Sequence, residues 1–170
     1  MSDTRARARV AATEAHAGQT YGDAPYEVHL DHVAAVVERF IAAADSRRGD
    51  LIVAAYLHDI VEDTAVTLDA VEADFGAAVA GLVAAVTDSP GRDRKERKAK
   101  TYPRIRATGP AAVLLKLADR IANVEASVAS APSKLGMYRK EWWGFFGALY
   151  DPTDGPHRPM WEHLERLLNA

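Results

Sequence analysis

Residues 51–64 read LIVAAYLHDIVEDT. The first seven residues are apolar, which is typical of a buried helical segment. The run ends in His58 and Asp59, and two more carboxylates, Glu62 and Asp63, follow within four residues. Ionisable groups packed behind apolar residues cost free energy unless a cation or another partner compensates them. We therefore expect a helix whose end carries a chemical site.

Helical periodicity continues on both sides of this stretch. Apolar residues at steps of three and four predict one helix from Leu68 to Val86, with Thr67 as its N-cap and the turn sequence 88–91 as its end. The other predicted helices are about 31–44, Pro110 through Val124, 134–149 and 160–168, with a turn at 151–156. No alternating pattern indicates strands and no internal repeat is visible. The predicted fold class is all-α.

Composition limits the remaining possibilities. With 170 residues and 48% hydrophobic content, the chain fits a single domain, residues 1–170. It contains no Cys, so any metal must bind through nitrogen and oxygen. No apolar run approaches the roughly 20 residues that span a bilayer, and no signal core follows the N-terminal arginines. We expect a cytoplasmic protein that contacts no membrane. A net charge of −3 argues against a nucleic-acid partner.

Four side chains from three predicted helices suit one divalent metal: His29, His58, Asp59 and Asp119. Two imidazoles and two carboxylates form a reasonable ligand set that leaves positions for water. Adjacent residues on a regular helix diverge by about 100°, so His58 and Asp59 share one ion only near a helix end or where the metal lies between them.

Each of these residues also has a structural interpretation. His58 and Asp59 could form a capped helix end, and Glu62 with Asp63 a helix-to-loop cap. Asp119 could pair with Lys116 or Arg120 on the helix surface. His29 competes with His32 and is preferred because a Pro-Tyr-x-x-His frame precedes it. The aromatic residues between 138 and 146 are expected to be core, although one ring could stack on a base.

The order of these blocks resembles a known family. The matching segments are PYEVH at 25–29, AAYLHDIVEDT at 54–64, FGAAV at 75–79 and KLADR at 116–120, with Asn123 after the last. Together they resemble the HD superfamily of metal-dependent phosphohydrolases, and most closely the RelA/SpoT-type hydrolase domain and its small single-domain relatives, the SpoT-homologue alarmone hydrolases. The resemblance covers about residues 8–150, which leaves 151–170 as a C-terminal helical extension.

The resemblance implies a single-domain helical HD fold with one metal, commonly Mn²⁺, held by His29, His58, Asp59 and Asp119. It also implies that Glu62 and Asp63 support the attack of water on phosphorus. The family's substrate is the small molecule ppGpp, the alarmone of the stringent response, and the reaction removes its 3′-pyrophosphate. We therefore expect a (p)ppGpp 3′-pyrophosphohydrolase.

One departure from the family concerns substrate binding. Members usually carry an Arg-Lys pair just before the Pro-Tyr element, whereas residues 19–25 here contain no cation. The segment 92–106 holds eight Lys or Arg against two acids and is either a phosphate-guiding patch or a solvated loop. Within it, Lys95, Arg97 and Lys98 are expected to neutralise substrate phosphates, and Asn123 to contact ribose or phosphate.

Two other functions remain open from the sequence. The first is the same chemistry on another nucleotide, such as a nucleoside monophosphate or a dinucleotide phosphate. The second is a non-catalytic nucleotide or metal sensor, which would have no need of Glu62 and Asp63. The ligand set suits Fe, Zn, Co or Ni as well as Mn²⁺, and the sequence does not determine the oligomeric state.

Overall fold

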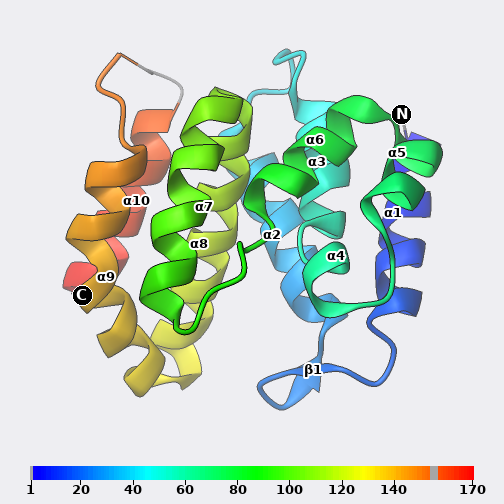
Figure 1. Ribbon diagram of the computed structural model, residues 1–170. Helices are drawn as coiled ribbons and strands as arrows, with labels where there is room; N and C mark the ends of the chain where they lie inside the picture. Colours follow the sequence, from blue (N-terminus) through cyan, green and yellow to red (C-terminus); the bar gives the residue numbers. More distant parts are fainter. Residues whose placement is uncertain (1, 154–156) are drawn as a thin grey trace.

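The computed structural model describes residues 2–153 and 157–170, and it confirms the all-α prediction (Figure 1). Its helices are α1 Ser2–Ala15, α2 Glu27–Phe40, α3 Arg48–Leu57, α4 Ile60–Asp63, α5 Leu68–Phe75, α6 Ala77–Val86, α7 Arg94–Thr108, α8 Pro110–Ser130, α9 Pro132–Leu149 and α10 Arg158–Asn169. Two short strands, β1 Thr20–Tyr21 and β2 Ala24–Pro25, lie between α1 and α2.

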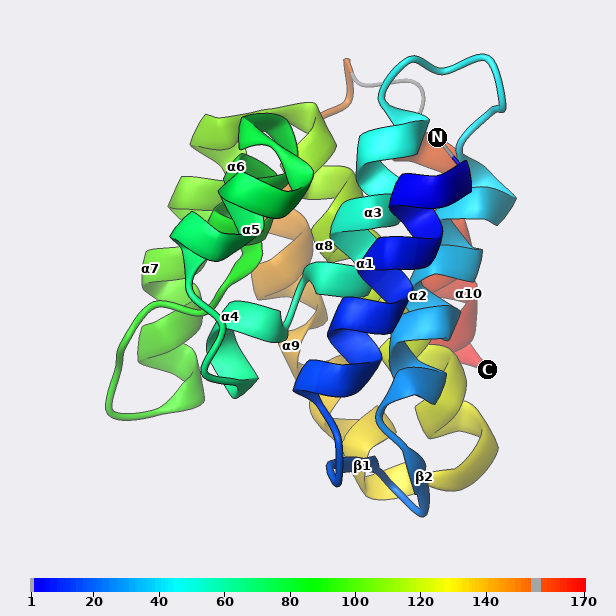
Figure 2. The same cartoon turned by 90° about the vertical axis from the view of Figure 1, so that its right-hand side faces the viewer.

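The core is built around α3 and α8. Every residue of the apolar run 51–57 in α3 is buried, and so is every residue from Ala112 to Ala122 in α8. Helix α8 contacts α2, α3 and α6 on one side and α7, α9 and α10 on the other. Figure 2 shows α1, α2 and α3 side by side, with the β1–β2 hairpin beyond the end of α2. The polar residues of α3 and α8 are therefore held by the most buried part of the molecule.

The single helix predicted for 68–86 is wrong, because the structure contains two helices there. Helix α5 ends at Phe75 and α6 begins at Ala77, with Gly76 between them at φ 89°. This is a left-handed backbone conformation that glycine adopts without the steric cost of a Cβ. The predicted N-cap is confirmed, since the Thr67 hydroxyl accepts the N–H of Ala70 at 3.3 Å.

The basic segment 92–106 is helical from Arg94 onward, rather than a loop. The Asp93 carboxylate accepts the N–H of Glu96 at 2.8 Å and so caps the first turn of α7. Only Thr101, Tyr102 and Ile105 of this helix are buried, so the apolar pattern in the sequence was too sparse to reveal it. The cations of this segment are consequently fixed on a rigid element.

Other boundaries differ by smaller amounts. Helix α2 begins at Glu27, four residues before the predicted start, which places His29 in its first turn. The expectation of no strands fails at the hairpin, where Thr20 pairs with Pro25 and Tyr21 with Ala24 around Gly22 at φ 62°. Part of the turn predicted at 151–156 lies outside the described residues, which omit 154–156.

The aromatic residues of α9 divide between core and surface. Phe145 is buried and packs on Trp161 of α10, with ring centroids 5.3 Å apart. Trp143, however, is 75% exposed, so its assignment to the core is wrong. In the described residues, no helix is both long and apolar enough to cross a membrane.

Candidate metal and active site

Helix α2 carries His29 on its inward face. Leu30, Val33 and Val37 are buried on the same helix and bring that face against the core. His29 itself is only 3% exposed, and its ring stacks on Tyr21 of the hairpin with centroids 4.6 Å apart. His32, the alternative candidate, lies away from this point and contacts Glu125 at 2.7 Å. The structure therefore presents His29, rather than His32, to the site.

The end of α3 explains how two sequence neighbours reach one point. His58 is the C-cap of α3 and Asp59 the N-cap of α4, so the chain turns between the two helices at this pair. The His58 ring lies with Nδ1 2.8 Å from the Ala55 carbonyl oxygen, which as an acceptor requires the proton on Nδ1. The other ring nitrogen, Nε2, faces Asp59 Oδ2 at 2.9 Å. This is the helix-end arrangement that the sequence required.

Asp119 is held by its own helix. One turn before it, Lys116 places Nζ 2.8 Å from Asp119 Oδ2, and one turn after it, the Asn123 side-chain amide donates to Asp119 Oδ1. The ion pair with Lys116 proposed from the sequence therefore exists, but it is buried and not on the surface. Arg120 does not join it and pairs with Glu141 of α9 at 2.8 Å.

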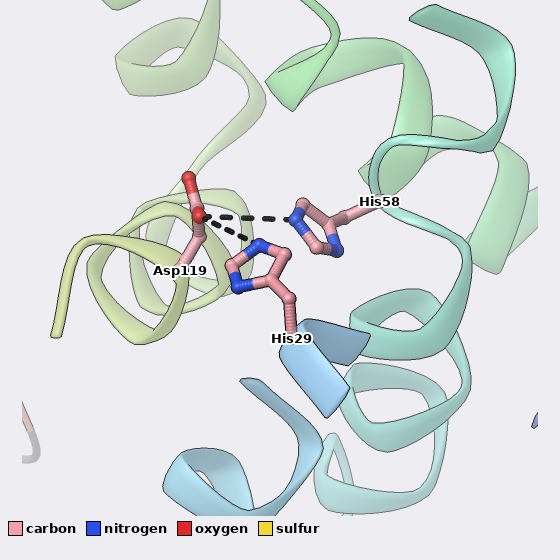
Figure 3. Close-up of side chains that lie close together, drawn as sticks. All are labelled: His29, His58 and Asp119. Atoms are coloured by element: carbon pink, nitrogen blue, oxygen red, sulfur yellow. Dashed lines mark ion pairs between the residues drawn. The ribbon is translucent and has the colours of Figure 1, made fainter. Parts of the chain in front are cut away.

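The three elements converge on one point (Figure 3). One possible ligand atom each from His29, His58 and Asp119 lie within 4.8 Å of one another. Asp119 Oδ1 is 3.5 Å from His29 Nε2 and 3.8 Å from His58 Nε2. Asp59 Oδ2 lies on the same side, 3.7 Å from His29 Nε2. In Figure 3 the rings of His29 and His58 point towards the Asp119 carboxylate from different elements.

The donor set fits a divalent cation. His58 Nε2 is buried and makes no aligned hydrogen bond within the described residues, although a carboxylate lies nearby. Burial alone would lower the pKa of His58, but Asp59 outweighs it and raises that pKa to about 9. Burial likewise opposes ionisation of Asp119, yet Lys116 and the two histidines hold its pKa well below the usual range. The site therefore favours a positive charge at the point where the imidazole nitrogens meet the carboxylates.

Glu62 and Asp63 lie beside this point in α4. Glu62 Oε2 accepts the backbone N–H of Asp88 at 2.8 Å. Asp63 Oδ2 lies 3.3 Å from the Tyr26 hydroxyl, which also donates to Asp59 Oδ2 at 2.6 Å. Burial is the main cause that raises the pKa of both Glu62 and Asp63. Both carboxylates are therefore easier to protonate than in water, which suits proton acceptance.

A cavity of about 180 Å³ joins the ligand residues to these carboxylates and is also lined by Lys98 and Asn123. Of the other predicted substrate-binding residues, Lys95 lines a different cavity, and Arg97 lies 3.6 Å from Asp88 outside the cavity wall. The structure thus brings Lys98 and Asn123 to the site and leaves Lys95 and Arg97 at its periphery.

Several lining residues were not predicted from the sequence: Tyr21, Tyr26, Asp88, Arg94, Lys116, Arg120 and Tyr138. For Lys116 a signal existed, because it lies three residues before Asp119 and therefore on the same helix face. The hairpin that lacks the family's cations places Tyr21 there, and Tyr21 donates to Asn123 Oδ1 at 2.8 Å. Lys134 of α9 lies over the Tyr21 ring at 5.3 Å, in a neighbouring cavity that Tyr21 and His29 also line.

Comparison with known proteins gives consistent matches. Residues 8–143 match the family described as HD domain. The mouse guanosine-3′,5′-bis(diphosphate) 3′-pyrophosphohydrolase MESH1 is 36% identical over 121 residues, which make up 69% of this chain and 68% of that protein. A Vibrio cholerae protein with the same enzyme name is 34% identical over 132 residues, covering 74% of this chain but 18% of the longer protein.

Among solved structures, one described as a metazoan ortholog of SpoT that hydrolyzes ppGpp superposes with a TM-score of 0.80. The match covers 98% of this chain and 94% of the other, at 24% sequence identity. At that identity the likeness shows a shared fold.

Proposed function

The chain belongs to the HD-domain family, and from that premise we propose that it is a metal-dependent hydrolase that removes the 3′-pyrophosphate from ppGpp. The observation that carries the proposal is the convergence of His29, His58 and Asp119 from three separate elements. His29 and Asp119 line one cavity together with the carboxylates of Glu62 and Asp63. Relatives named for this activity support the choice of substrate.

The proposed metal ligands are His29, His58, Asp59 and Asp119, with Mn²⁺ as the proposed ion. A bound divalent ion would supply a Lewis acid that neutralises phosphoryl charge and makes water more acidic. The chain's own part is to hold the ligands in place. Lys116 and Asn123 fix the Asp119 carboxylate, the Ala55 carbonyl fixes the His58 tautomer, and Tyr26 orients Asp59.

Glu62 and Asp63 are the proposed catalytic residues. The Asp88 N–H holds one oxygen of Glu62, and its other oxygen has no hydrogen bond within the described residues. That oxygen is available to take a proton from an attacking water, and the raised pKa of the carboxyl favours the transfer. Burial and the nearby Asp59 raise the pKa of Tyr26, so its hydroxyl keeps the proton that it donates to Asp59 at 2.6 Å, and Asp63 lies 3.3 Å from the same hydroxyl.

Substrate phosphates are assigned to cations around the cavity. Lys98 lines the cavity and lies 2.9 Å from both carboxylate oxygens of Asp88. We place Asn123 against the ribose or a phosphate, and Lys95 and Arg97 against outer phosphates, since both lie on α7 beyond the cavity wall. The protein is proposed to act in the cytoplasm as one HD domain, with the segment 151–170 as an extension whose helix α10 packs on α8 and α9.

The test is product release from a nucleotide panel that includes ppGpp, with metal-stripped protein reconstituted with Mn²⁺. The expected result is pyrophosphate from ppGpp, with GDP as the other product. Turnover of a different nucleotide alone would support the mechanism but not ppGpp as the substrate. The absence of a cation from the hairpin is the specific reason to test other nucleotides. No turnover despite bound metal would favour a sensor.

A further inference from the structure

A second cavity lies next to the active site, between helices α7 and α9. It has a volume of about 650 Å³, against about 180 Å³ for the metal cavity. Figure 1 shows α7 and α9 on the same side of the molecule, and the two helices are in contact. Small-molecule sites in proteins typically occupy roughly 300–1,000 Å³, so this α7–α9 groove has the size of a ligand site.

The body of the α7–α9 groove is apolar. Tyr102 and Phe145 line its inner part, with ring centroids 5.7 Å apart. Gly144 and Ala148 of α9 face Ala99 of α7 across it. These small side chains leave the space between the helices unfilled, and a Cβ built on Gly144 meets nothing within 4 Å. The groove therefore suits a flat apolar group.

The rim of the groove carries positive charge without a partner. Lys95 of α7 and Lys140 of α9 are both exposed, and neither forms an ion pair with any residue that the structure describes. Other cations nearby have carboxylate partners, since Arg94 pairs with Glu141 at 2.6 Å and Lys98, the proposed phosphate contact of the metal cavity, pairs with Asp88. Two unpaired ammonium groups beside an apolar slot favour a ligand with an anionic end.

We propose that the α7–α9 groove is a second binding site, for a nucleoside monophosphate whose base enters the apolar slot and whose phosphate lies between Lys95 and Lys140. This site goes beyond the hydrolase function, and it shares Lys95 with the outer substrate phosphates proposed above. Arg94 and Lys98 line both cavities, so a ligand in the groove would contact the same side chains that line the catalytic cavity. The Asp88 that pairs with Lys98 also holds Glu62 through its N–H.

The experiment is calorimetric titration of the metal-free protein with GMP. Gly144→Leu should weaken binding by about tenfold or more, because its side chain fills the slot. Gly147→Leu is the matched control: it makes the same change on the same helix at an exposed position outside the groove, and GMP affinity should not change. Circular dichroism and the melting temperature of both variants show whether α9 remains folded.

A second pair of variants tests the phosphate end. Lys140→Glu should weaken GMP binding severalfold and reduce its salt dependence, since one cation of the rim is reversed. Lys134→Glu makes the same change on the same helix at the cavity beside Tyr21, and it should leave GMP affinity unchanged. Absence of GMP binding to the wild type would overturn the proposal. So would binding that falls with Lys134→Glu and not with Gly144→Leu or Lys140→Glu.

Discussion

Asp59 and Glu62 are three residues apart but have different surroundings. Asp59 faces the imidazoles of His58 and His29, at 2.9 and 3.7 Å. Glu62 faces the backbone N–H of Asp88 at 2.8 Å. We therefore propose the first carboxylate as a metal ligand and the second as the proton acceptor. Substitution of the two residues should separate metal binding from turnover.

We expect Glu62→Gln to bind Mn²⁺ with wild-type affinity and to lose about 10²–10⁴-fold in kcat, the usual contribution of a general base. Asp59→Ala should lose both metal affinity and activity. Titration calorimetry with Mn²⁺ and an assay of pyrophosphate release measure the two properties. Wild-type turnover in either variant would show that the site is misassigned.

At the residue scale, the sequence predicted which His, Asp and Glu residues form the candidate site, because their motifs occur at recognisable spacings. It did not predict the role of Lys116, because a lysine within a helix is ordinarily solvent-exposed. Its burial depends on contacts with the Asp119 carboxylate and on helices that pack around α8. The pair lies within α8, but its burial by the surrounding helices is a property of the folded chain.

At the scale of secondary-structure elements, the break between α5 and α6 depends on one glycine. Gly76 is the C-cap of α5 and the residue from which α6 starts, and its φ of 89° is unfavourable for any residue with a Cβ. Space is not the constraint, since a Cβ at Gly76 would meet nothing within 4 Å. The cost of a substitution there comes from the backbone conformation.

Gly76→Ala should therefore lower the free energy of unfolding by about 1–2 kcal/mol. Gly81→Ala is the matched control within α6, where a helical glycine also has open space around its Cβ, and it should raise stability by about 0.5–1 kcal/mol. Urea denaturation of both variants measures the difference. Equal effects of the two substitutions would mean that α5 and α6 do not need the left-handed residue.

Element boundaries show where a periodic pattern is insufficient. The apolar positions of 68–86 continue in register across Gly76, so periodicity alone predicted one helix. Helix α7 was missed for the opposite reason, because its buried stripe is short and its sequence is rich in charge. In both regions a single residue marks the boundary. Gly76 separates α5 from α6, and Asp93 caps the start of α7.

Across the whole molecule, Glu125 joins three helices. From α8 it contacts His32 and Arg39 of α2 and His163 of α10, at 2.6–2.7 Å. Burial opposes ionisation, but these partners outweigh it and lower the pKa of Glu125 from 4.5 to about 2. A depressed pKa means that the folded state holds the ionised carboxylate more strongly than the unfolded chain does. This stabilisation is complete above pH 4.5 and is lost as the pH falls towards 2.

Glu125→Gln should lower the free energy of unfolding at pH 7 by about 1–2 kcal/mol, a value reduced from the full pKa shift because the group is partly exposed. The difference from wild type should shrink between pH 4.5 and 2, as the wild-type carboxylate takes up its proton. Chemical denaturation across this pH range measures it. A difference that stays constant down to pH 2 would contradict the assigned role of the charge.

The cavities belong to this scale too, and the sequence did not predict them. The α7–α9 groove needs Gly144 of α9 and Ala99 of α7, which are 45 positions apart in the sequence (144 − 99), to line the same space. The hairpin without a cation is a second example, since Lys134 reaches its Tyr21 from α9. Family motifs identify the metal centre, whereas the packing of this chain determines what surrounds it.

The most direct test of the central claim is the rate of pyrophosphate release from ppGpp as Mn²⁺ is added back to metal-stripped protein. The account predicts no turnover without metal, a rise that saturates when one equivalent is bound, and no rise in Asp119→Asn. Full turnover by the metal-free protein, or saturable Mn²⁺ binding with no pyrophosphate release, would contradict it.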